Sequence, residues 1–120
     1  MRRARARRYR ALLEGLPLAL PLASEASSWH LFVVHIDRTK TRVTRKALFD
    51  RLRSTGIEAH VHYIPIHLQP YYRALGFKPG DFPMAEAHYE NCLSLPIYPS
   101  MTDEEQDRVV SALRDELSRA

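Results

Sequence analysis

A cluster of three histidines and one tyrosine lies in the segment HVHYIPIH, residues 60–67. His60 and His62 are two positions apart, a spacing that puts both side chains on the same face of a β-strand. Imidazole rings arranged in this way can bind a metal ion, transfer a proton or donate hydrogen bonds to a substrate. The cluster is the main candidate for chemistry in this sequence, and the rest of the chain decides among the three.

A metal site would use the two strand histidines, with His67 curling back as a third ligand. The β-barrels that hold such sites need more short strands than this sequence offers, and Glu58 lies one step further along the same face. Cys92 is the only cysteine, which excludes a thiolate cluster and an intrachain disulfide. We expect no metal ligands. A structural alternative stays open, in which His60 and His62 form a solvated strand face and His67 is hydrogen-bonded in its loop.

Catalytic motifs are missing from the sequence. It contains no Gly-rich phosphate loop, nucleophile elbow or paired-carboxylate arrangement. Its lysines, Lys40, Lys46 and Lys78, fall in a turn, near a helix start and in a second turn, and none has the buried setting that activates an amine as a nucleophile. We therefore expect no catalytic residue and no cofactor-binding residue in this chain.

Composition and charge are those of one small globular domain, with 120 residues, 45% apolar and 27% charged. The net charge of +4 is local, because the first ten residues hold six arginines and the other 110 carry a net charge of −2. An arginine run can bind nucleic acid or an acidic membrane surface, but no basic, aromatic-interleaved stripe extends it. We expect neither partner.

The apolar stretch after the arginines imitates a targeting peptide. It is far shorter than the ~20 residues that span a bilayer, and it is interrupted by Glu14, Gly15, Pro17 and Pro21. The sequence favours a cytoplasmic protein.

Three segments have the pattern of β-strands. Residues 29–36 are apolar on both alternating faces, which predicts a central strand. Residues 57–63 alternate cleanly, with the histidines on the polar face, and Pro65 ends that strand. Residues 93–99 form a third, brief strand.

Helix signals separate these strands and follow the last of them. The expected helices are a turn or two over 7–13, one from Thr44 to Gly56, short ones starting at Pro70 and near Met84, and a last one with a Thr102–Glu105 capping box. The sequence therefore predicts an α+β fold, a small sheet of about three strands with helices packed on one face.

A family resemblance is carried by SSWHLFVVHI and by TRKALFDRLRSTGIEAHVHYIPIHLQPYYRALGFKPGDFPMAEAHYENCLSLPIYPSMTDEEQDRVVSAL. From about Arg7 to Leu113 the chain resembles the C-terminal small domain of the DegT/DnrJ/EryC1/StrS sugar aminotransferases, which are fold-type I enzymes dependent on pyridoxal phosphate. The resemblance implies that residues 1–23 are the end of an interdomain helix and a linker, and that residues 24–120 are the small domain.

The activity implied by this resemblance is amino transfer from glutamate to a 4-keto-6-deoxy UDP-sugar, in a homodimeric enzyme. The wording is nearest to family members that make a UDP-4-amino-4,6-dideoxy sugar. The cofactor's lysine lies on a large N-terminal domain that these 120 residues do not contain, so we expect the chain alone to bind no pyridoxal phosphate and to be inactive.

The resemblance also implies a substrate site. His62, Tyr63 and His67 would line the cleft facing the large domain and offer hydrogen bonds to sugar hydroxyls or phosphates. Two alternatives remain: a non-catalytic module that docks on a separate large domain, and a small metal-binding protein.

Overall fold

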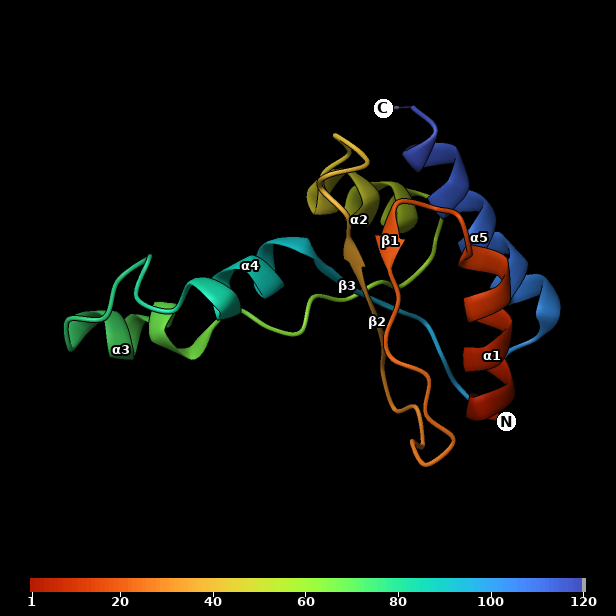
Figure 1. The fold of residues 1–120 in the computed structure, drawn as a ribbon, viewed down its shortest axis with the longest axis horizontal. Coiled ribbons are helices and arrows are strands. Elements are labelled where there is room, and N and C mark those ends of the chain that lie inside the picture. Colours follow the sequence, from red (N-terminus) through yellow and green to blue (C-terminus); the bar gives the residue numbers. More distant parts are fainter. Residues whose placement is uncertain (120) are drawn as a thin grey trace.

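A three-stranded antiparallel sheet lies at the centre of the computed structural model, which describes residues 1–119 (Figure 1). The strand order is β1-β2-β3, so the long apolar strand is central, as its sequence predicts. In register, Leu18 pairs with Ile36 and Phe32 with Leu95. The strands are β1 (Leu18–Ala19), β2 (Phe32–Ile36) and β3 (Cys92–Leu95).

Five α-helices and one short 3₁₀ helix join and cover these strands. Every predicted helix is present, and the first begins at Arg2, five residues earlier than the pattern indicates. Within the described residues, no helix is both long enough and apolar enough to cross a membrane. The helices are α1 (Arg2–Leu13), α2 (Arg45–Ser54), the 3₁₀ helix η1 (Ile66–Leu68), α3 (Pro70–Ala74), α4 (Pro83–Asn91) and α5 (Asp103–Leu117).

The ends of α2 and α5 are set by local sequence, as predicted. The Thr44 hydroxyl accepts a hydrogen bond from the backbone N–H of Ala47, and Gly56 follows α2 with a φ of 81°, a conformation that favours glycine. At α5, Thr102 and Glu105 form the reciprocal capping box.

The hydrophobic core lies between one face of the sheet and helices α1, α2 and α5. Phe32, Val34 and Ile36 alternate along β2 and are buried against these helices. The Tyr9 ring of α1 is fully buried, and its centroid lies 5.0 Å from that of Phe32. The opposite face carries His35, which contacts α4. The architecture is thus the predicted α+β fold, with the main helices on one face.

The predicted strand over 57–63 is wrong. Only His60 pairs with the sheet, through two backbone hydrogen bonds to Ser94 of 2.8 and 3.2 Å. Ile57 and Ala59 are buried as the alternation indicates, but Tyr63 is 70% exposed. The antiparallel pairing does not continue from Ser94 toward Leu93 and Cys92, so the segment has a single pairing point and then leaves the sheet.

The third strand of the sheet, β1, is not predicted by the sequence pattern. β1 is two residues long and lies between prolines 17 and 21, in the stretch that the family resemblance assigns to a linker. A strand of this length has no measurable period, so only its pairing with β2 reveals it.

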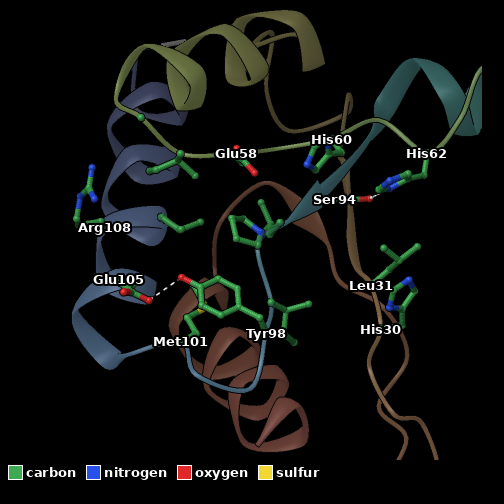
Figure 2. Close-up of a pocket in the computed structure, with 16 residues that line it drawn as sticks. His30, Leu31, Glu58, His60, His62, Ser94, Tyr98, Met101, Glu105 and Arg108 are labelled. Carbon is green, nitrogen blue, oxygen red and sulfur yellow. Dashed lines mark hydrogen bonds between the residues drawn. The ribbon is translucent and has the colours of Figure 1, made fainter.

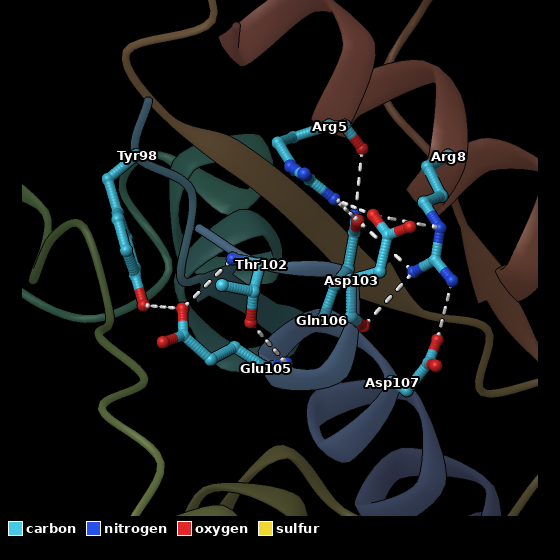
Figure 3. Close-up of polar contacts among 8 residues, drawn as sticks. All are labelled: Arg5, Arg8, Tyr98, Thr102, Asp103, Glu105, Gln106 and Asp107. Atoms are coloured by element: carbon cyan, nitrogen blue, oxygen red, sulfur yellow. Dashed lines mark hydrogen bonds and ion pairs between the residues drawn. The ribbon is translucent and has the colours of Figure 1, made fainter. Parts of the chain in front are cut away.

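The N-terminal arginines bind α1 to the start of α5 (Figure 3). Arg5 forms an ion pair with Asp103, and Arg8 forms one with Asp107 at 2.8 Å. Between them the fully buried Gln106 accepts from both guanidinium groups and donates to the Arg5 carbonyl at 2.8 Å. The hydrogen bond from Arg5 and the nearby Arg8 charge lower the pKa of Asp103. Part of the arginine run therefore serves internal packing.

Tyr9 carries the first testable prediction. Its hydroxyl donates to the Pro96 carbonyl at 2.6 Å, and burial raises the pKa of Tyr9, which keeps the phenol neutral. Tyr9→Phe leaves that carbonyl without its partner, and we expect a loss of about 1–3 kcal/mol in the free energy of unfolding, measured by urea titration. Tyr98→Phe is the matched control, because it removes the same group from a half-exposed ring. Equal losses in the two variants would contradict this account.

Candidate functional site

An arm of residues 63–91 projects sideways from the sheet and contains η1, α3 and α4 (Figure 1). Its surface exposes many apolar side chains in one region, which is rare on monomeric proteins. They are Tyr63, Ile64, Ile66, Tyr71, Tyr72, Leu75, Phe77, Phe82 and Met84. Such a surface is suited to contact with another protein domain.

A polar hollow of about 540 Å³ lies where the arm leaves the sheet, between β3, α5 and residues 56–62 (Figure 2). Side chains that can donate or accept hydrogen bonds line it from several elements. They are His30, Glu58, His60, His62, Ser94, Tyr98, Glu105 and Arg108.

The polar groups at one end of the hollow are hydrogen-bonded within the fold. The Tyr98 hydroxyl donates to Glu105 at 2.6 Å, which lowers the pKa of Glu105 and raises that of Tyr98. Glu105 also accepts from the Thr102 backbone within the capping box. Arg108 donates to the Thr55 carbonyl at 2.8 Å. These groups are already paired, so ligand-binding capacity gathers at the histidine end.

His62 occupies that histidine end. Its Nδ1 lies 2.8 Å from the hydroxyl oxygen of Ser94, which is only 3% exposed (Figure 2). The ring meets the Tyr63 ring edge-on, with centroids 4.5 Å apart. The ring is thus hydrogen-bonded to β3 and packed against a phenol. His62 can act as a positioned hydrogen-bonding group.

The three predicted site residues do not share one pocket. His62 lines the polar hollow, and Tyr63 stands exposed beside it. His67 lines a second, apolar pocket of about 480 Å³ within the arm, where its ring packs edge-on against Phe82. His62 and Tyr63 therefore remain neighbours, while His67 belongs to a separate part of the surface.

His67 is bound into the arm by Glu86. Its Nε2 lies 3.0 Å from the Glu86 carboxylate, and the residue is only 6% exposed. The same carboxylate accepts the backbone N–H groups of Gly80 and Phe82, and the Gly80 amide is the main cause that lowers the pKa of Glu86. Nδ1 is the ring nitrogen left for a ligand, so His67 can offer at most one further hydrogen bond.

Ser94 and Glu86 are partners that sequence reasoning missed. Ser94 is 32 residues from His62, and Glu86 is 19 residues from His67. The wording around Ser94 predicts a buried strand, and that around Glu86 predicts a short polar helix. Neither pattern indicates a contact with a histidine, because only folding brings these segments together.

The metal-binding alternative requires several ligating side chains close together. Among residues 1–119, no group of three or more histidine, cysteine, aspartate and glutamate side chains is placed to hold a metal ion. Cys92 is buried, as expected of a small apolar residue, and burial raises the pKa of its thiol.

The described residues thus form an α+β domain with a polar hollow at the sheet edge and an apolar arm. Residues 1–114 match the DegT/DnrJ/EryC1/StrS aminotransferase family, and the chain belongs to that family. It is 40% identical over 113 residues to the spore coat polysaccharide biosynthesis protein SpsC of Bacillus subtilis, covering 90% of this chain and 29% of SpsC.

Solved structures of larger proteins contain the same fold. The PMP form of the putative sugar aminotransferase Spr1654 from Streptococcus pneumoniae matches with a TM-score of 0.88 and 27% identity, over 98% of this chain and 30% of that one. DesV of S. venezuelae, solved with a ketimine intermediate, matches with a TM-score of 0.83 and 35% identity, over 99% and 32%. The chain therefore spans about a third or less of the length of these relatives.

Pyridoxal phosphate needs a lysine for its imine, and the lysines of this chain do not fit that role. Lys40, Lys46 and Lys78 are highly exposed, and each pairs with an aspartate three or four residues away. The hollow and the apolar pocket contain none of them. The described residues do not supply the attachment point of this cofactor.

The arm is tied to the sheet by a histidine pair. His35 Nε2 on β2 lies 2.7 Å from His88 Nδ1 on α4. Burial and then the His88 charge lower the pKa of His35. Beside the pair, Arg45 donates to the Tyr89 carbonyl at 2.7 Å and lies over the Tyr89 ring. The pair is stable only while at least one imidazole is neutral, because two protonated rings at this distance repel.

The second testable prediction follows from the lowered pKa of His35. Below the ordinary histidine pKa of about 6.5 the unfolded chain binds a proton that folded His35 resists, so stability is full above this pH and falls as the pH drops. We expect the melting temperature to decrease between pH 7.5 and 5.5, and His35→Phe to flatten that decrease. Exposed His30→Ala serves as the control. An unchanged slope in His35→Phe would show that the pair does not govern this window.

Proposed function

We propose that the chain is the C-terminal small domain of a nucleotide-sugar aminotransferase. The complete enzyme, a homodimer using pyridoxal phosphate, would move an amino group from glutamate to a 4-keto-6-deoxy UDP-sugar. The family match of residues 1–114, together with the shared fold of sugar aminotransferases, carries this proposal. Spr1654 has been solved in PLP and PMP forms, which supports the choice of cofactor.

The proposed product is UDP-4-amino-4,6-dideoxy-N-acetyl-β-L-altrosamine. The segments VHYIPIHLQPYY and KPGDFPMAEAHYENCLSLPIYPSMTDEE support this product, because they resemble the transaminase that makes this sugar. The cytoplasm is the proposed location.

In this proposal the chain positions substrate and does no covalent chemistry. His62 would donate from the hollow to an oxygen of the sugar or its phosphates, and Tyr63 would add its phenol from the exposed side. His67 would contribute through Nδ1, with Nε2 held by Glu86. The remaining protein would supply the lysine and bind the cofactor.

The arm supports docking on a large domain, in the same chain or in a separate one. Its exposed aromatic and aliphatic side chains are held in a fixed shape by Glu86 and by the His35–His88 pair. A preformed apolar surface of this kind suits a protein partner. We place the boundary between interdomain helix with linker and small domain at residue 23. The docking module without catalytic partnership is the second candidate, favoured by the same surface.

The isolated chain provides the third prediction. We expect no stoichiometric covalent label on its lysines after treatment with pyridoxal phosphate and borohydride, because each amine is exposed and paired with a carboxylate. Peptide mass spectrometry measures the label. One specifically modified lysine would contradict the division of labour between this chain and a large domain.

The fourth prediction needs turnover, so it uses a chimaera in which this chain replaces the matching segment of the Bacillus subtilis relative. We expect His62→Ala and His67→Ala each to lower kcat/KM for the UDP-sugar roughly ten- to hundredfold, the cost of one hydrogen bond to a polar or charged ligand. The half-reaction with glutamate, which makes no nucleotide contact, should change little.

Glu86→Gln is the matched control for His67, because it weakens the arm's internal contact and keeps the imidazole. If His67→Ala and Glu86→Gln slow both half-reactions equally and lower the melting temperature together, His67 is a structural residue of the arm. If His62→Ala leaves the sugar half-reaction intact, the hollow is not the sugar site. Inactivity of the unmutated chimaera with every UDP-keto sugar tested would favour the docking module.

A further inference from the structure

Ser94 lies on β3 at the edge of the hollow, and its hydroxyl is buried. It is 3% exposed, and its oxygen lies 2.8 Å from His62 Nδ1. Its backbone holds the same segment, since Ser94 N donates to the His60 carbonyl at 2.8 Å and His60 N donates to the Ser94 carbonyl at 3.2 Å. One residue of β3 therefore fixes both the path of residues 60–62 and the ring of His62.

The direction of the side-chain hydrogen bond follows from hydrogen-bond accounting. A serine hydroxyl carries one proton, and a buried polar proton needs an acceptor. Within residues 1–119, His62 Nδ1 is the one partner that the structure gives this hydroxyl. If Nδ1 carried the proton instead, the Ser94 proton would be buried without an acceptor. The hydroxyl therefore donates, and Nδ1 of His62 accepts.

The tautomer of His62 is fixed by that direction. A neutral imidazole has one N–H, so acceptance at Nδ1 puts the proton on Nε2. The ring borders the hollow, so we expect Nε2–H to be available there as a donor. A donor in this position selects an oxygen acceptor, such as a phosphoryl or sugar hydroxyl oxygen, over a donor group.

We propose that Ser94 is a positioning residue that holds His62 in its Nε2–H tautomer, so that His62 presents a hydrogen-bond donor to an oxygen of the ligand. The role of the ligand rests on the proposed function, whereas the tautomer is a property of this chain alone. The same residue pins the segment by its backbone, so a side-chain change at Ser94 leaves those two bonds available.

The tautomer is measured on the isolated chain by long-range ¹H–¹⁵N spectra of ¹⁵N-labelled protein at pH 8, where imidazoles are neutral. We expect the wild-type His62 Nδ1 to have the shift of an unprotonated nitrogen and Nε2 that of a protonated one. In Ser94→Ala this preference should fall to a mixture of both tautomers, and Ser94→Thr, which keeps the hydroxyl, should restore it. His60, exposed on the same segment, is the internal control and should not change.

A protonated Nδ1 in the wild type would overturn the proposal, and this measurement needs no variant. An Nε2–H fraction in Ser94→Ala equal to that of the wild type would overturn it as well, since the hydroxyl would then not be the cause. Amide spectra and melting temperatures of both variants check that the fold persists.

Ligand presentation is tested by titrating the same proteins with UDP-N-acetylglucosamine as a stable UDP-sugar probe. We expect shifts at His62 in the wild type and an affinity reduced in Ser94→Ala in proportion to the remaining Nε2–H fraction, about twofold for an equal mixture of tautomers, with recovery in Ser94→Thr. No shift at His62 in the wild type would count against the proposed sugar contact. The tautomer result, obtained without ligand, would then separate failure of the proposed function from failure of the role of Ser94.

Discussion

Coverage of one face of a very small sheet is the constraint on which the structure depends. The strands have two, five and four residues, too little for a sheet to stand in water without packing against helices. Tyr9, Phe32 and Leu113 are fully buried where α1, β2 and α5 meet. The polar contacts of Arg5 and Arg8 with the start of α5 then fix how the two helices lie side by side.

One face of the sheet and helices α1, α2 and α5 form the core. The polar side chains of the candidate site therefore lie at the free edge of β3 and on the outer face of the sheet. The edge accepts residue 60 as a single bridge, and this brings His62 over Ser94. The same departure from the sheet opens the hollow between β3 and α5.

The arm follows a different physical logic, because it buries little and relies on directed polar contacts. Glu86 gathers two backbone amides and His67, and His35 with His88 joins the arm to the sheet. Its apolar side chains remain on the surface. Under the proposed function, that surface and the edge hollow would face the rest of the enzyme.

The sequence by itself determined the elements whose signals are local. The Thr44 cap, the Thr102–Glu105 capping box and the doubly apolar pattern of residues 29–36 each specify structure within a few neighbours. The quoted family segments indicate the family to which the chain belongs. Only the tertiary structure decided the pairing of β1, the single bridge at His60 and the partners of His62 and His67. Those contacts join residues 16 to 34 positions apart, and hydrogen bonds of that range leave no periodic trace in a sequence.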